Sequence, residues 1–275
     1  LKRPRLIERI RAAIPDPDQR LRWLIGDVRD RDRLRRAMDG CDVVIHAAAL
    51  KRVEVGEYNP IEMVKTNIVG AQNVIEASID AKVGKVVALS SDKACAPLNA
   101  YGASKLTAEK LFLAAGTLAG ADGPRYAVCR YGNVAGSTGS IIPTWRAQMA
   151  SAGRVSVTHP DCTRYWMSVE EAVDVVLWTV AHLRGGELVV PDLPAYRLGD
   201  LAQAIGAEID ISGLRAGEKM HEQMVSDHEA PEFARVGECW VRGAAGGSEM
   251  LSSALSSATA PRLTVVEIRE RLGAI

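Results

Sequence analysis

Short hydrophobic runs alternate with amphipathic stretches along most of the chain. The runs predict buried strands, and the stretches with an apolar residue at every third or fourth position predict helices. Strands that alternate with helices of this length indicate an α/β fold with a doubly wound parallel sheet. The predicted strands are Leu21–Ile25, Asp42–His46, Lys85–Leu89, Tyr126–Arg130 and Glu187–Val190, and the predicted helices are Asp30–Met38, Ile61–Ala81, Tyr101–Ala119 and Val169–Leu183.

The pattern changes after Gly136, where loops, helices and shorter predicted strands follow. Two of these strands are Arg154–Val157 and Glu208–Ile211. We interpret this part as a smaller lobe that is interleaved with the last elements of the sheet. The expected division assigns residues 1–153 and 168–191 to the α/β domain and residues 154–167 and 192–275 to the lobe.

Small and polar residues follow the predicted strands. In a doubly wound sheet, ligands bind at the carboxyl ends of the strands. We therefore expect the functional site to include residues from these strand ends. The segments concerned are Gly26-Asp27, Ala47–Lys51, Ser90–Lys93 and Tyr131–Asn133.

The segment Ser90–Lys105 carries the strongest candidate chemistry. Tyr101 and Lys105 are four positions apart and share one helix face. An ammonium group beside a phenol lowers the pKa of the tyrosine below its usual ~10. Such a pair can take a proton from a sugar hydroxyl while a nicotinamide takes the hydride, and Ser91 can hydrogen-bond to the same hydroxyl. Tyr-x-x-x-Lys alone is common, but the preceding strand and the Ser-Ser-Asp-Lys sequence make the signal specific.

Composition excludes several classes of protein. The formal net charge is +0 and 47% of the residues are hydrophobic, so nothing indicates binding to nucleic acid or to a membrane surface. The 5 cysteines form no Cys-x-x-Cys or Cys/His metal pattern, which fits reduced thiols in a cytoplasmic protein. No apolar run approaches the ~20 residues that span a bilayer, and no signal peptide is recognisable.

Motifs spread over nearly the whole chain carry a family resemblance. They are Gly26–Asp30, His46–Lys51, Glu57–Pro60, Lys65–Asn67, Ser90–Lys105, Arg130–Val134, Gly136–Pro143, Thr163–Trp166 and Arg215–Glu222. In this order they resemble the extended short-chain dehydrogenase/reductase superfamily. More narrowly, they are similar to the inverting UDP-N-acetylglucosamine 4,6-dehydratases of pseudaminic acid synthesis and to related polysaccharide-biosynthesis dehydratases. The resemblance implies a dinucleotide-binding Rossmann domain and a substrate-binding lobe.

The resemblance also implies catalytic roles. More distant sugar dehydratases carry Thr-Asp-Glu where this chain has Ser91-Asp92-Lys93, so lysine occupies the position of the base. Tyr101, helped by Lys105 and Ser91, would deprotonate the 4-hydroxyl of the sugar. Lys93, if neutral, would remove the proton from carbon 5, and Asp92 would protonate the departing 6-hydroxyl. For this, we expect burial and Lys105 to lower the pKa of Lys93 from ~10.4 toward ~7–8. The alternative interpretation of Asp92 and Lys93 is a surface ion pair.

Binding residues follow from the same resemblance. The cofactor is expected to be NADP, with NAD possible, and the substrate UDP-N-acetylglucosamine or a similar nucleotide sugar. The alternative interpretation of Lys51 is an ordinary exposed lysine, and that of Arg164 and Arg215 is a structural role. His46 is expected to pack rather than to react. The implied cofactor-binding residues are Asp27, Val28, Ala47, Lys51, Ser90, Tyr101, Lys105 and Val134, and the implied substrate-binding residues are Lys51, Asn133, Arg164, Arg215 and Glu218.

The family pattern begins with a segment that the sequence does not contain. Relatives open with a strand, a G-x-G-x-x-G phosphate loop, a helix and a second strand, whereas Leu1 matches a point just after that strand. We expect that roughly 40 native residues, about one strand–helix–strand unit, precede Leu1 in the intact protein or were removed from it. Without them, the remaining strands are expected to form an altered sheet.

Three functional interpretations remain at this point. The leading one is a 4,6-dehydratase, a lyase with tightly bound NADP. A nucleotide-sugar 4-epimerase would use Tyr101 and Lys105 but leave Lys93 without a role. A cofactor-less binding module of the same fold would explain the lack of a phosphate loop. The predicted long helices Ile61–Ala81 and Tyr101–Ala119 match those that pair between subunits in this superfamily, so a homo-oligomer is expected.

Overall fold

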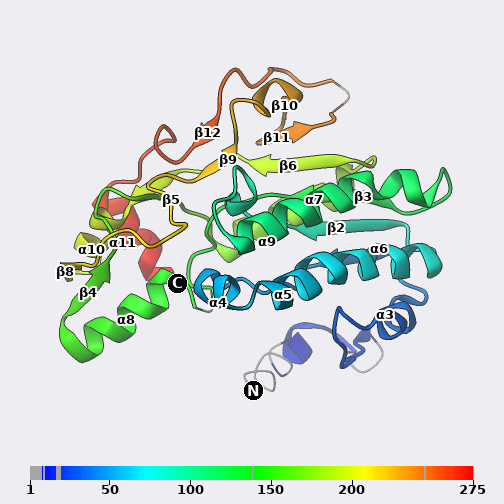
Figure 1. Ribbon diagram of the computed structural model, residues 1–275, viewed down its shortest axis with the longest axis horizontal. Helices are drawn as coiled ribbons and strands as arrows, with labels where there is room; N and C mark the ends of the chain where they lie inside the picture. The colour runs from blue at the N-terminus through cyan, green and yellow to red at the C-terminus, as the bar shows by residue number, and fades with distance from the viewer. Residues whose placement is uncertain (1–7, 9, 17–19, 138, 245, 275) are drawn as a thin grey trace.

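The structure, a computed structural model, describes residues 8, 10–16, 20–137, 139–244 and 246–274 (Figure 1). Leu1, from which the expected preceding segment was inferred, lies outside the described residues. Within them, no helix combines the length and the apolar character that crossing a membrane requires.

A six-stranded sheet forms the centre of the molecule, in the order β1-β2-β3-β6-β11-β10. The first four of these strands run parallel, whereas β11 is antiparallel to β6 and β10 is antiparallel to β11. This arrangement confirms the predicted α/β fold with a parallel sheet. The strands are β1 (Val43–His46), β2 (Lys85–Leu89), β3 (Arg125–Cys129), β6 (Glu187–Pro191), β10 (Phe233–Val236) and β11 (Cys239–Arg242).

Helices cover both faces of this sheet, because successive side chains of a strand point to opposite sides. Val86 and Val128 belong to one hydrophobic cluster, together with residues of α6 and α7 such as Phe112. Val87 lies in another cluster, with Val176 of α9. The sheet is therefore doubly wound, as predicted. The helices are α6 (Gly70–Asp80), α7 (Ala100–Ala119) and α9 (Val169–His182).

The predicted long helix over 61–81 is a continuous run of three helical segments that follows α4 (Val53–Tyr58). These segments are α5 (Pro60–Met63), the π-helical η1 (Val64–Val69) and α6. Asn67 of η1 is buried, and its amide donates to the Leu50 carbonyl oxygen at 2.9 Å and to Ser104 Oγ at 2.9 Å. The loop after β1 is thereby fastened to α7, the helix that carries Tyr101 and Lys105.

A smaller lobe with its own core lies at one end of the sheet (Figure 1). Its core contains Trp145, Trp166, Tyr196, Leu201 and Ile268. Its elements, and those that join it to the sheet, are α8 (Ile141–Ala152), β4 (Arg154–Val157), β5 (Thr163–Tyr165), β7 (Ala195–Arg197), α10 (Leu198–Ala204), β8 (Glu208–Ile211), β9 (Gln223–Val225), η3 (Ala230–Glu232), β12 (Leu255–Ser256) and α11 (Val265–Gly273).

The border between sheet and lobe differs from the expected division in two places. The hairpin β10–β11 extends the main sheet through β6, although the sequence analysis placed its residues in the lobe. Trp145 of α8 packs in the lobe core, although the expected division assigned it to the α/β domain. Both differences arise because pairing and packing partners far apart in the sequence leave no local signal.

The predicted strand Leu21–Ile25 is wrong. These residues form no strand, and Trp23, Leu24 and Ile25 are 43%, 52% and 85% exposed. Among the described residues no strand pairs with this segment, and an apolar run without a hydrogen-bonding partner does not become part of a sheet. β1 consequently lies at the edge of the sheet, where Ile45 is 47% exposed. The next element, α3 (Arg31–Met38), begins as predicted, with Asp30 accepting from the Arg33 backbone N–H at 3.0 Å.

Candidate active site

The site is built at the carboxyl end of β2, where the chain enters the short 3₁₀ turn η2 (Asp92–Ala94). Ser91 caps this turn by accepting from the Lys93 backbone N–H at 3.3 Å. The Asp92 backbone N–H donates to the Tyr131 carbonyl oxygen at 3.0 Å, which fixes the turn to the end of β3. A Cβ atom at Gly102 would lie 2.3 Å from the Lys93 carbonyl oxygen. Only glycine at this position lets α7 approach the turn so closely.

Lys93 lies between two carboxylates. Its Nζ atom is 3.2 Å from Asp92 Oδ1 and 3.3 Å from Glu222 Oε1, and both acids are buried. Burial lowers the pKa of Lys93, but the negative charges of Asp92 and Glu222 outweigh this effect and raise the pKa above its ordinary value. The expectation that burial and Lys105 lower this pKa toward neutrality was therefore wrong. In this structure Lys93 is an ammonium ion at neutral pH.

Tyr101 and Lys105 lie on the first turns of α7, but they are not partners in the way the spacing suggested. Lys105 Nζ donates to the Leu89 carbonyl oxygen at 2.6 Å. Burial raises the pKa of Tyr101, and the opposing influences come from Lys93 and from a hydrogen bond with Ser91. The predicted lowering of the Tyr101 pKa by Lys105 was wrong, because Lys93 is the cation that acts on the phenol. Burial also lowers the pKa of Lys105 to about 8.

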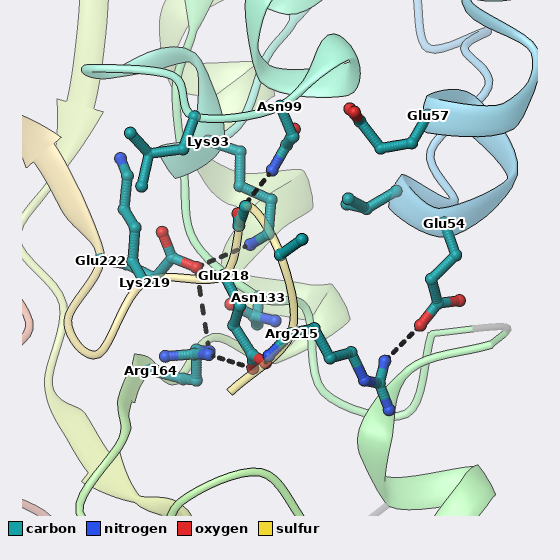
Figure 2. A pocket seen from close by; sticks show the side chains of 14 residues that line it. Glu54, Glu57, Lys93, Asn99, Asn133, Arg164, Arg215, Glu218, Lys219 and Glu222 are labelled. Carbon is teal, nitrogen blue, oxygen red and sulfur yellow. Dashed lines mark hydrogen bonds and ion pairs between the residues drawn. The ribbon is translucent and has the colours of Figure 1, made fainter. Parts of the chain in front are cut away.

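A cavity of ≈ 190 Å³ opens beside this turn (Figure 2). Five residues predicted from the sequence line it, and they come from both the sheet and the lobe. These are Lys93, Asn133, Arg164, Arg215 and Glu218, and the further lining residues with polar side chains are Glu54, Glu57, Asn99, Lys219 and Glu222. The side-chain oxygen of Asn133 is buried and has no hydrogen-bond partner.

Two arginines hold different places in this cavity. Arg164 is 7% exposed, and its guanidinium donates to Glu218 Oε1 at 2.8 Å. Arg215 is exposed and forms an ion pair with Glu54 of α4, which Figure 2 shows apart from the Lys93 cluster. The two arginines thus bring positive charge to one cavity from separate segments of the chain.

None of the eight predicted cofactor-binding residues lines this cavity, and four of them lie on segments before α4. Asp27 is exposed and its carboxylate is 2.9 Å from the Arg29 guanidinium, whose hydrogen bond lowers the pKa of Asp27 to about 2. The Val28 carbonyl oxygen accepts from the Asn73 side chain at 3.0 Å. Ala47 and Lys51, which follow β1, are exposed. The structure therefore does not bring these residues together with Lys93.

A second, much smaller cavity of ≈ 10 Å³ lies beside Ser90 and Lys105. Ser90 is 7% exposed, and its hydroxyl has no hydrogen-bond partner. Val134, the remaining predicted cofactor residue, forms a bridge to Met167. His46 also lines this cavity; burial lowers its pKa to about 4, and its ring lies 5.4 Å from that of Phe112. His46 therefore packs against Phe112, as predicted.

A buried network of ion pairs connects α7 to the rest of the molecule. Arg130 is 1% exposed and lies 2.6 Å from Glu109 of α7 and 3.0 Å from Glu229. Its guanidinium also donates to the Met224 carbonyl oxygen at 2.8 Å. The network joins α7, β3 and the segment after β9, so it fixes α7 relative to the segment that carries Glu222.

Glu222 was missed as a site residue. It ends the recognised stretch Arg215–Glu222, but nothing local distinguishes it from any other glutamate. Its backbone is fixed on both sides by Ser257, whose hydroxyl accepts from the Glu222 N–H at 2.8 Å and whose N–H donates to the Glu222 carbonyl oxygen at 2.8 Å. Because Ser257 is distant in the sequence, only the tertiary structure places Glu222 against Lys93.

Known proteins are similar to this chain in sequence and in architecture. An inverting UDP-N-acetylglucosamine 4,6-dehydratase of Campylobacter jejuni is 47% identical over 213 residues, which cover 76% of this chain and 64% of that enzyme. A UDP-glucose 4-epimerase of Rickettsia akari is 40% identical over 228 residues, covering 81% of this chain and 66% of that enzyme. The chain thus spans less than two thirds of the length of the Campylobacter enzyme.

Solved structures agree on the fold. The X-ray structure of Pen from Bacillus thuringiensis superimposes with a TM-score of 0.90 at 34% identity, covering 98% of this chain and 86% of that one. DesIV, a dTDP-glucose 4,6-dehydratase from Streptomyces venezuelae solved with NAD and TYD bound, gives a TM-score of 0.68 at 24% identity, covering 77% of this chain and 73% of that one. At this level of identity DesIV supports the Rossmann fold alone.

One sequence family accounts for most of the chain. The profile of the polysaccharide biosynthesis proteins matches residues 7–242, which include η2, α7 and every residue around Lys93 described above. Together with the Bacillus structure, this match shows that the chain is a member of the polysaccharide biosynthesis protein family.

Proposed function

We propose that this chain carries out the chemistry of a nucleotide-sugar 4,6-dehydratase, which converts UDP-N-acetylglucosamine to a 4-keto-6-deoxy sugar with inversion at carbon 5. The product would serve bacterial surface polysaccharide or nonulosonic acid synthesis. One observation carries the proposal: Lys93, the base candidate, lines the cavity, its Nζ atom is 3.2 Å from Asp92, the acid candidate, and its charge acts on Tyr101. The similarity to the Campylobacter enzyme supports the same reaction.

The residues present fit a nicotinamide cofactor, which we propose to be tightly bound NADP, with NAD as the alternative. The unpartnered buried hydroxyl of Ser90, next to Lys105, is a polar group that a ribose hydroxyl could satisfy. Ser90, Tyr101, Lys105 and Val134 would hold the nicotinamide end, and Asp27, Val28, Ala47 and Lys51 the remainder. When bound, such a cofactor accepts a hydride from carbon 4 and returns it to carbon 6.

The proton transfers fall to the side chains of this chain. Tyr101, hydrogen-bonded to Ser91, takes the proton from the 4-hydroxyl in its phenolate form, which the positive charge of Lys93 favours and burial opposes. The resulting ketone acidifies the proton on carbon 5, which the amine of Lys93 removes. Asp92, which is 3.2 Å from Lys93 Nζ, receives the proton that Lys93 has taken and passes it to the departing 6-hydroxyl, so that water leaves. The return of a proton to the opposite face of carbon 5 inverts that centre.

Substrate binding is assigned to the arginines of the cavity. A guanidinium donates two parallel hydrogen bonds and so suits a diphosphate, which favours Arg164 and Arg215 for this role. Glu218, which accepts from Arg164 at 2.8 Å, would orient that guanidinium and meet the ribose. The unpartnered oxygen of Asn133 would accept a hydrogen bond from the sugar. Lys51 keeps a proposed role at the sugar or a phosphate, although it lies outside the cavity.

We further propose a cytoplasmic homo-oligomer. Exposed apolar side chains on α4 and α5, including Tyr58 at 88% and Ile61 at 63%, support pairing between subunits. Sedimentation analysis tests this directly.

Proton NMR of the protein with UDP-N-acetylglucosamine and NADP in deuterated water tests the proposed reaction. We expect a new 6-methyl signal, deuterium at carbon 5 and couplings that show inversion there. Unchanged sugar together with NADP binding would indicate a binding module. A 4-epimer would indicate the alternative activity, which the similarity to the Rickettsia epimerase favours.

The Lys93→Met variant separates the dehydratase from the epimerase. A dehydratase loses its base, and we expect kcat to fall by about 10³-fold. An epimerase would keep nearly full activity, because it needs only Tyr101 and the cofactor. The NADP affinity of the variant is the control for intact folding.

A further inference from the structure

The proton on Lys93 is an obstacle to the proposed reaction. The ammonium is held between Asp92 Oδ1 at 3.2 Å and Glu222 Oε1 at 3.3 Å, and an ammonium ion cannot remove a proton from carbon. The site must therefore hold a group that takes this proton before the base can act. That group must be buried, close to Nζ and able to accept a proton.

Glu222 meets these requirements better than Asp92. Asp92 Oδ1 also accepts the Ser91 hydroxyl at 2.7 Å, and a hydrogen bond of this kind stabilises the charged form of the carboxylate. Each acid has one buried oxygen without a hydrogen-bond partner, Asp92 Oδ2 and Glu222 Oε2, but only Glu222 lines the cavity. A buried carboxylate oxygen without a hydrogen-bond partner is costly, and of the two acids Glu222 alone combines such an atom with a place in the cavity lining.

Arg164 acts on both members of this pair. Its Nε atom lies 3.8 Å from Glu222 Oε1 and its guanidinium 2.8 Å from Glu218 Oε1, and its positive charge works to lower the pKa of Lys93. Tyr101 and Asp92 are the other groups whose charge acts on Lys93. Figure 2 shows the carboxylate of Glu222 between Lys93 and Arg164.

We propose that Glu222 is a positioning residue that takes the proton from Lys93 and so frees the Lys93 amine to act as the base. An N–H bond of the ammonium breaks and an O–H bond forms on Glu222, so that an ion pair becomes a neutral pair with no change in net charge. The amine then uses its lone pair to take the proton from carbon 5, and the electrons of that C–H bond pass to the enolate of the substrate. A bound sugar that expels water from the cavity favours the neutral pair, because charges lose more by desolvation than neutral groups do.

This inference rests on the proposed dehydratase function and is tested on the same protein. The measurement is exchange of the carbon 5 proton with deuterated solvent, compared between wild type, Glu222→Gln and Glu222→Asp. We expect Glu222→Gln to slow the exchange by about 10²-fold, and Glu222→Asp, which keeps a carboxylate, to recover part of it. The residual exchange in Glu222→Gln should rise with pH, because hydroxide then has to remove the proton from Lys93.

A second readout is independent of turnover. Nitrogen NMR of labelled lysine follows the protonation of Lys93 Nζ, which should lose its proton at lower pH in Glu222→Gln than in wild type, since one of its two carboxylates is gone. Thermal unfolding of the variants reports whether they fold. If Glu222→Gln unfolds, Glu222→Asp and Ser257→Ala, which removes the acceptor of the Glu222 N–H, take its place, and both should slow the exchange.

Three results would overturn the inference. The first is a rate of carbon 5 proton exchange in Glu222→Gln that equals the wild-type rate at all pH values. The second is loss of exchange in Glu222→Gln but not in Lys93→Met, which would make Glu222 itself the base. The third is a Lys93 titration that does not respond to the change at Glu222. Absence of any keto sugar with the wild type would instead contradict the proposed function.

Discussion

Lys93 and Lys105, two lysines of the candidate active site, have opposite electrostatic surroundings. Lys93, on the turn after β2, has carboxylates at 3.2 and 3.3 Å and keeps its proton. Lys105, on α7, is 7% exposed, whereas the side chain of Lys93 is 25% exposed. Lys105 donates to the Leu89 carbonyl oxygen, and its pKa falls to about 8. The difference teaches that burial alone does not decide the charge of a lysine. The number of carboxylates within contact distance decides it.

The largest expected effect comes from the ion network that holds the Lys105 helix. Glu109→Gln leaves the buried Arg130 with Glu229 alone, and we expect the free energy of unfolding to fall by about 3 kcal/mol. Denaturant unfolding measures this. The exposed glutamate Glu232, 3.6 Å from Arg242, is the matched control, and Glu232→Gln should change little. Equal losses in the two variants would contradict the role given to burial.

The pH dependence of stability sharpens the comparison between the two lysines. The folded state lowers the Lys105 pKa from 10.5 to about 8, so between these pH values the unfolded state binds more protons. Stability should therefore rise with pH across this window, by up to about 3 kcal/mol relative to Lys105→Met.

Lys93 provides the control for this experiment. Its folded-state pKa is raised above 10.5, so its stabilising contribution is fully present below that pH and is lost only at higher pH. Wild type and Lys93→Met should thus change in parallel between pH 8 and 10.5. A Lys105→Met variant that behaves in the same way as Lys93→Met would show that the two sites do not differ.

The close contact between α7 and the turn that carries Lys93 depends on Gly102. A methyl group there would meet the Lys93 carbonyl oxygen, so we expect Gly102→Ala to cost about 2 kcal/mol of stability. The displaced turn should also lower kcat at least tenfold, because small errors of position in an active site are costly. Gly116 lies on the same helix, and a Cβ atom added there would have no atom within 4 Å. It is the control, and Gly116→Ala should be neutral or slightly stabilising.

The smallest effect is expected at the exposed ion pair beside the cavity. Glu54→Gln releases Arg215 from its exposed partner, which contributes little to stability. A free guanidinium should bind a diphosphate better, and we expect KM for the nucleotide sugar to fall about twofold to threefold. Steady-state kinetics measure this, and an increase in KM would show that Glu54 holds Arg215 in its binding position.

Local patterns were sufficient for most elements of the fold. The strands β2, β4 and β8 have the predicted bounds, and α7 begins at Ala100, one residue before the prediction. They were predictable because apolar periodicity and turn residues lie within each element. The segment Leu21–Ile25 has the same apolar pattern but no partner strand among the described residues, so its pattern alone was not sufficient.

The site was only partly predictable. Lys93, Arg164, Arg215 and Glu218 were found because they lie in recognisable motifs, and the structure places them around one cavity. Ser257 and Glu222 were not found, because their importance comes from contacts over 35 positions of sequence.

The sequence by itself therefore determined most strands and helices of the parallel part of the sheet, the family and the candidate reactive side chains. The tertiary structure alone decided which charges meet. It paired Lys93 with Glu222 and left Lys105 without a carboxylate in contact, and this reversed the protonation expected for the base. The physical reason is that secondary structure follows from neighbours along the chain, whereas a pKa follows from burial and from charges brought together across it.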